Sequence, residues 1–140
     1  MRVLEGYSGG KTVFSGSAMG TGAAGMGVLC AWKKCFLMNK TAPFILVAFV
    51  GAPLSQTIYG MILMNALRGA GEALPFTKFA VGLMGGLAIG ASAYLQGKAG
   101  ALASDALADA EKGFGNFIMV LGIIETVALF VMVFLMTTLK

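Results

Sequence analysis

The sequence contains no histidine, only two cysteines and very little charge. Charged residues make up 11% of the 140 positions, far below the roughly 25% of a typical soluble domain. The absence of histidine argues against a zinc or haem site. Cys30 and Cys35 are five residues apart on a predicted helix, which places them on different faces and argues against a disulfide or a metal pair.

Two other features that would indicate a partner or a destination are missing. The ten basic residues are scattered over short loops and form no stripe alternating with aromatics, so we expect no nucleic acid as a partner. Residues 1–10 lack an apolar core followed by a small-residue cleavage site, so we expect no signal peptide and a retained first helix.

Long apolar runs dominate what is present. Hydrophobic residues make up 58% of the chain, and its mean hydropathy is +0.86. A helix that crosses a bilayer needs about 20 apolar residues. Four runs have this length and little or no charge: 12–32, 41–67, 79–97 and 113–139. We therefore predict an all-α integral membrane protein with four transmembrane helices and no separate soluble domain.

The four predicted helices alternate in character. The first and third are rich in small residues, including Gly16 and Gly20 in one and Gly86 and Gly90 in the other. Small residues at a spacing of four let helix backbones approach closely in lipid. The second and fourth helices are built from bulky apolar residues, and Pro53 interrupts the second, where we expect a kink.

This alternation reflects an internal repeat. A shift of 65 residues lays the first helix on the third, and a shift of 71 lays the second on the fourth. We interpret the chain as two tandem helical hairpins, residues 1–70 and 71–140. Leu54 then corresponds to Glu125, and Ala31 to Gln96. The second hairpin alone therefore keeps the carboxylate and its amide partner.

Glu125 is the single charged residue near the middle of the fourth span. A charge at this depth costs at least ~2.5–3.5 kcal/mol on insertion scales, so it requires a compensating partner. A buried carboxylate becomes neutral by protonation, by pairing with a basic side chain or by binding a cation. No Lys or Arg lies at mid-depth in any of the four spans, which excludes an ion pair.

Polar residues of two other helices are candidate partners. Gln96 and Glu125 lie at similar distances from the turn near residue 110, so an antiparallel hairpin puts them at similar depth. Ser55, Gln56 and a carbonyl near Pro53 add further oxygens, and Tyr59 shares a helix face with Ser55. A hard cation such as Na⁺ needs several oxygen ligands. A proton needs only the carboxylate, so the chemistry favours sodium.

Several motifs together carry a family resemblance that covers nearly the whole chain. They are Pro53-Leu54-Ser55-Gln56-Thr57-Ile58-Tyr59-Gly60, Gln96-Gly97-Lys98-Ala99 and Ile124-Glu125-Thr126, set in two hairpins of one Gly-rich and one bulky helix. In this combination the chain resembles the duplicated proteolipid, the c or K subunit, of V-type and A/V-type rotary ATPases. It resembles in particular the bacterial sodium-pumping kind.

The resemblance implies a role for each candidate residue. Glu125 matches the glutamate that binds the transported ion, and Gln96 matches a glutamine ligand. Ser55 and Gln56 match the hydroxyl and amide ligands, and Ala52 supplies the carbonyl ligand. Tyr59 matches a tyrosine that hydrogen-bonds the glutamate. Ser55 and Ala52 replace threonine and leucine of the sodium type, and both keep the liganding oxygen.

The resemblance also implies an assembly. Copies of the chain would form a rotor ring, with the small-residue helices inside and the bulky helices facing lipid. The ring would load Na⁺, or otherwise H⁺, from a stator subunit of the a or I type and would turn with central-stalk subunits. ATP would be handled in a separate soluble head, so this chain would be non-catalytic and would need no cofactor. The implied location is a prokaryotic cell membrane, with both hairpin turns in the cytoplasm.

Two other functions remain open from the residues alone. One is a small four-helix cation or drug antiporter that works as a dimer. Such transporters need aromatic residues around the acid, whereas Glu125 has Ile124 and Thr126 as neighbours. The other is a non-transporting assembly protein, in which replacing Glu125 would leave ion transport intact.

Overall fold

The computed structural model describes the backbone of residues 2–71 and 75–139 and the side chains of residues 10–71 and 75–139. Every regular element in these residues is a helix. In chain order they are α1 (Arg2–Leu37), η1 (Phe44–Leu46), α2 (Val47–Gly51), η2 (Ala52–Leu54), α3 (Ser55–Gly69), α4 (Pro75–Ala110) and α5 (Phe114–Thr137).

Four helical segments among the described residues are long and apolar enough to cross a membrane. They are Gly10–Leu37, Phe44–Gly69, Pro75–Ala110 and Phe114–Thr137. The expected all-α architecture with four such helices is confirmed. Part of the connection between the two predicted hairpins, residues 72–74, lies outside the described residues.

Two helices are longer than the apolar runs that predict them. α1 begins at Arg2, ten residues before the apolar run 12–32, because the first ten residues contain no proline to stop a helix. α4 is one continuous helix that extends beyond the apolar run 79–97 at both ends, from Pro75 to Ala110. Proline at its first position fits, because the missing N–H has no intrahelical partner there.

Pro53 produces the expected interruption of the second span. It lies in the short 3₁₀ segment η2, which separates α2 from α3. Proline lacks the backbone N–H that would bond the preceding turn, and tightening to 3₁₀ geometry accommodates this loss. The interruption is local, because the residues at both of its ends keep right-handed helical backbone angles.

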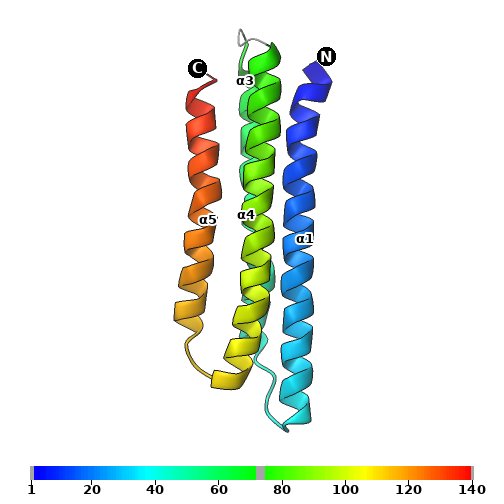
Figure 1. The fold of residues 1–140 in the computed structure, drawn as a ribbon, viewed down its shortest axis with the longest axis vertical. Coiled ribbons are helices and arrows are strands. Elements are labelled where there is room, and N and C mark those ends of the chain that lie inside the picture. Colours follow the sequence, from blue (N-terminus) through cyan, green and yellow to red (C-terminus); the bar gives the residue numbers. More distant parts are fainter. Residues whose placement is uncertain (1, 72–74, 140) are drawn as a thin grey trace.

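α1 and α4 pack backbone against backbone through glycines (Figure 1). A β-carbon added at Gly16 would collide with the backbone of Gly90, and one added at Gly97 would collide with the backbone of Gly20. Such close approach lets van der Waals contact hold helices together where lipid provides no hydrophobic driving force. α4 thereby becomes the centre of the bundle, with α3 and α5 against its other sides.

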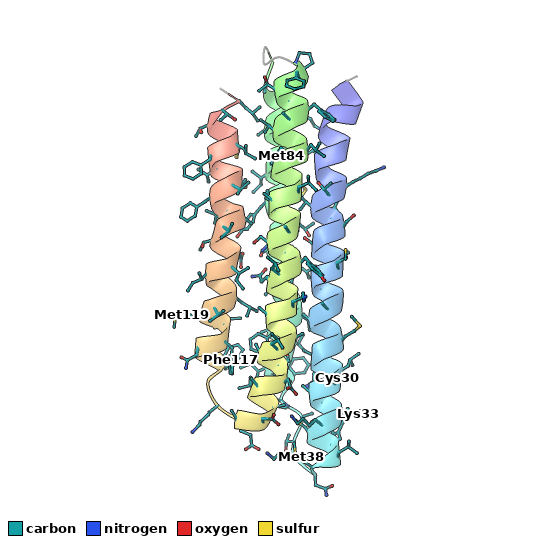
Figure 2. All side chains as sticks on the ribbon, in the orientation of Figure 1. Cys30, Lys33, Met38, Met84, Phe117 and Met119 are labelled. Carbon is teal, nitrogen blue, oxygen red and sulfur yellow. The ribbon has the colours of Figure 1, made fainter. Side chains whose placement is uncertain are left out.

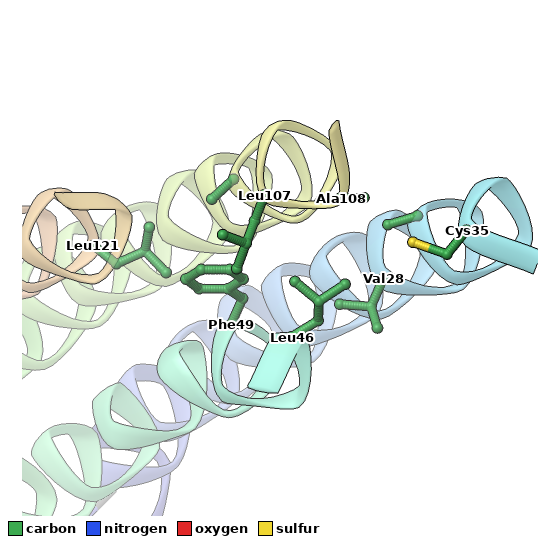
Figure 3. Packing of buried hydrophobic residues seen from close by; sticks show 9 residues of the cluster. Val28, Cys35, Leu46, Phe49, Leu107, Ala108 and Leu121 are labelled. Atoms are coloured by element: carbon green, nitrogen blue, oxygen red, sulfur yellow. The ribbon is translucent and has the colours of Figure 1, made fainter. Parts of the chain in front are cut away.

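A hydrophobic cluster and ion pairs close the end of the bundle that carries the turns. Phe49 is fully buried among side chains of the other helices (Figure 3). Its ring lies 5.4 Å from that of Phe114. The cluster comprises Val28, Ala31, Cys35, Leu46, Phe49, Ala103, Leu107, Ala108 and Leu121. Beside it Lys34 Nζ lies 2.6 Å from Asp109 Oδ2, which ties α1 to the end of α4.

The outer sides of the bundle are covered with bulky apolar side chains. Met119 of α5 is exposed on one outer side, and Cys30 of α1 is exposed on the other (Figure 2). Phe134 of α5 is 65% exposed. An exposed apolar surface of this extent indicates lipid or further protein as its neighbour.

The glycine contacts generate a prediction for stability. In Gly97→Ala the new β-carbon collides with the Gly20 backbone, so α1 and α4 must separate. Overpacking of this kind costs about 1–3 kcal/mol, and we expect thermal unfolding in detergent to occur several degrees lower. Gly69→Ala is the control, because nothing lies within 4 Å of its β-carbon position. Equal melting temperatures for the two variants would contradict the close contact.

Candidate functional site: a carboxylate within the bundle

Glu125 lies in the middle of α5 and is half-buried. Its Oε1 accepts a hydrogen bond of 2.7 Å from the Tyr59 hydroxyl, and its Oε2 accepts one of 3.3 Å from Gln96 Nε2. A carboxylate has about four lone-pair sites, so both oxygens keep room for a further partner. The ion pairs among the described side chains lie at the turn end, and none includes Glu125.

Gln96 joins α4 to α5. Its side chain is fully buried, and its Nε2 also donates to the backbone carbonyl of Leu121 at 3.0 Å. That carbonyl belongs to the turn of α5 directly before Glu125. Both protons of the Gln96 amide are therefore directed at α5, and its Oε1 is left to face α3.

Gln56 closes the network from α3. It lies in the first turn after η2, is fully buried, and its Nε2 donates to Gln96 Oε1 at 3.0 Å. Its own Oε1 is buried and has no hydrogen-bond partner. Buried side-chain oxygens are usually paired, so an unpaired one in a polar cluster requires an explanation.

Ser92 belongs to the same network although sequence reasoning did not select it. Its hydroxyl donates to the carbonyl of Ile124 at 2.9 Å and accepts from Gln56 Nε2 at 3.3 Å. Ser92 lies four residues before Gln96 on α4, which puts both side chains on one helix face. That spacing was the available signal, but a serine among alanines is a common packing residue and did not stand out.

Ser55 and Ala52 lie at the edge of this network, where the Ser55 hydroxyl also interacts with the Tyr59 hydroxyl. The Ser55 hydroxyl donates to the Ala52 carbonyl at 2.9 Å, and the Ser55 backbone N–H donates to the same oxygen. Within the described part of the chain, no hydrogen bond joins either residue to Gln56, Gln96 or Glu125.

The chemistry of the cluster suits a monovalent cation or a proton. The searched residues contain no group of three or more His, Cys, Asp or Glu side chains that could hold a metal ion. The cluster instead combines one carboxylate with neutral amide, hydroxyl and carbonyl oxygens. One negative charge balances one positive charge, which is the condition for a neutral group within a membrane.

A comparison with known protein families finds a match in the second half of the chain. No curated protein matches the sequence. Residues 79–137, which include most of α4 and α5 up to its last residue, match the family described as the C subunit of ATP synthase. This segment contains Ser92, Gln96 and Glu125, and together with the four apolar spans it indicates a membrane location. The C-terminal part of the chain thus matches the c-subunit family of the ATP synthase and V-ATPase.

Proposed function

We propose that this protein is a membrane rotor proteolipid of a V-type rotary ATPase and carries one cation per chain on Glu125. The observation that carries the proposal is the network around Glu125, in which Tyr59 of α3 and Gln96 of α4 hold one carboxylate oxygen each. The family match of residues 79–137 supports it independently. A carboxylate that can exchange its counter-ion within the membrane is what a rotor needs.

Sodium is the proposed cargo, with a proton as the alternative. Gln96 of α4 bonds the carboxylate directly, and Gln56 of α3 bonds Gln96, so two helices bring amide groups into the network around Glu125. The fully buried oxygen of Gln56 without a partner is available to a cation. Ser55 and Ala52 complete the proposed ligand set, and for both to bind, the Ser55–Ala52 bond must rearrange. Oxygen ligands of this kind suit a hard cation, whereas a proton needs none of them.

The proposed working form is a ring of identical chains. The bulky apolar side chains that α5 exposes suit contact with lipid, and the glycine-packed α1 and α4 suit the inner wall. A stator subunit of the a or I type would load and unload Glu125, and central-stalk subunits would couple the ring to a soluble head that handles ATP. In this scheme residues 1–70 form the hairpin without the carboxylate and residues 71–140 form the hairpin that carries the ion-binding Glu125. The hairpin turns face the cytoplasm of a prokaryotic cell.

Carbodiimide labelling of Glu125 tests the cation site. The reagent modifies only the protonated carboxyl group, so a bound sodium ion that displaces the proton should protect it. We expect millimolar Na⁺ to slow labelling severalfold at constant pH, with no effect of K⁺ at equal ionic strength. Glu125→Gln is the control and should not be labelled at this position. Labelling that ignores Na⁺ would show that the site takes protons alone.

The Tyr59 hydrogen bond generates a second prediction. In Tyr59→Phe the carboxylate loses its bond of 2.7 Å, and a hydrogen bond to a charged group contributes about 1.5–3 kcal/mol. We therefore expect labelling of Glu125 without sodium to become faster, on the order of tenfold. The matched control is Tyr94→Phe, since Tyr94 lies on α4 near Lys98. If both variants behave like the wild type, Tyr59 does not restrain Glu125.

The size of the particle in mild detergent separates the rotor from the antiporter. The ring predicts a mass many times the 14.4 kDa of one chain, measured by native mass spectrometry with the detergent removed. A dimeric antiporter predicts twice that mass. A dimer that still binds sodium would overturn the proposed rotor ring, whereas the proposed cation site would stand.

A further inference from the structure

Ser92 lies where the three helices of the site meet. It is 6% exposed, and its hydroxyl connects Ile124 of α5 with Gln56 of α3. A serine hydroxyl has one proton and two lone pairs. Because its proton is donated to the Ile124 carbonyl, only lone pairs remain on the side that faces Gln56.

Two oxygens therefore converge on one nitrogen. Gln56 Nε2 lies 3.3 Å from Ser92 Oγ and 3.0 Å from Gln96 Oε1. Both oxygens act as acceptors at this point, and the amide nitrogen with its partially positive protons lies between them. An arrangement of acceptors around a positive group is also the arrangement that a cation requires.

The Gln56 amide has its oxygen on the side without partners. Its Oε1 is buried and accepts no hydrogen bond, which is costly for a fully buried group. A half-turn of the amide would bring Oε1 towards the oxygens of Ser92 and Gln96. Three oxygens with no proton between them repel one another, so this orientation requires a cation among them.

A second buried oxygen without a partner, a hydroxyl on α1, lies at the depth of Gln56. α1 and α3 run antiparallel, and their close contacts join Gly60 with Val13 and Gly20 with Pro53. Ser17 lies midway between these contacts on α1, as Gln56 does on α3. Ser17 is 2% exposed and its hydroxyl has no hydrogen-bond partner. Ser17 and Gln56 thus lie at similar depth on facing helices, and no hydrogen bond joins the Ser17 hydroxyl to Gln56 Oε1.

We propose that Ser92 Oγ is a further oxygen ligand of the cation, which it binds together with Gln96 Oε1 and the turned Gln56 Oε1 beside Glu125. The proposal rests on the proposed cation-carrying function and extends it to a residue of α4. Under this proposal α4 provides two ligands one helical turn apart, Ser92 and Gln96. The close packing of α4 against α1 then holds both ligands in position.

The test is sodium protection of Glu125 against carbodiimide in Ser92→Ala, measured on the assembled protein. We expect the sodium concentration for half-protection to rise about tenfold, whereas the pH of half-labelling without sodium stays unchanged. Ser104→Ala is the matched control. Ser104 is a fully buried serine on the same helix, and its hydroxyl bonds only the Gly100 carbonyl at 2.7 Å. Its half-protecting concentration should equal that of the wild type.

Each outcome decides a separate question. If sodium does not slow the labelling of Glu125 in the wild type, this result overturns both the sodium site and the role of Ser92 as its ligand. If sodium protects the wild type, unchanged or tighter protection in Ser92→Ala overturns the role of Ser92 alone. Ser92→Ala could also change the pH of half-labelling without sodium. If the proton affinity of Glu125 then changes by the same factor as the half-protecting sodium concentration, Ser92 only positions Glu125. Should Ser92→Ala fail to assemble, the structure of the sodium-loaded wild type decides by whether Ser92 Oγ contacts the ion.

Discussion

A carboxylate within the hydrocarbon layer of a membrane has to be neutralised, and the arrangement of α3, α4 and α5 depends on this requirement. Glu125 takes no part in the ion pairs that join described side chains at the turn end. The bundle instead surrounds it with dipoles. Tyr59 and Gln96 each donate to one of its oxygens, and the remaining lone pairs are left for an exchangeable positive charge. Under the proposed function, this combination of restraint and spare hydrogen-bonding capacity suits a carboxylate that exchanges its counter-ion.

Close packing at the glycines positions the amides around this carboxylate. Gly97 directly follows Gln96 on α4 and lies against the backbone of Gly20 on α1. With α1 pressed against that side of α4, its other sides are left to α3 and α5, and the two glutamines meet there. A larger residue at the glycine position would collide with that backbone and push α4 away from α1. The packing of one face therefore sets the geometry of the polar face.

The two hairpins carry different kinds of residue at two pairs of positions that the repeat aligns, Leu54 with Glu125 and Ala31 with Gln96. Leu54, the counterpart of Glu125, is 52% exposed on the outside of the bundle. Ala31, the counterpart of Gln96, is fully buried in the hydrophobic cluster at the turn end. Both residues have packing roles that need no polar partner. One cation per chain follows from this difference under the proposed function.

The amino-acid sequence by itself determined the number and type of the spans, the interruption at Pro53 and the choice of Glu125 as the central residue. These follow from run length, backbone chemistry and the energy of a charge in lipid, which are local properties. The sequence also pointed to Gln96, Gln56 and Tyr59, because polar side chains within a span are few. Only the tertiary structure decided which of them reach the carboxylate. It brought Ser92 into the network and left the Ser55 hydroxyl on the nearby Ala52 carbonyl. Residue type does not reveal the direction of a hydroxyl or an amide, because that direction depends on which acceptor the neighbouring helix presents.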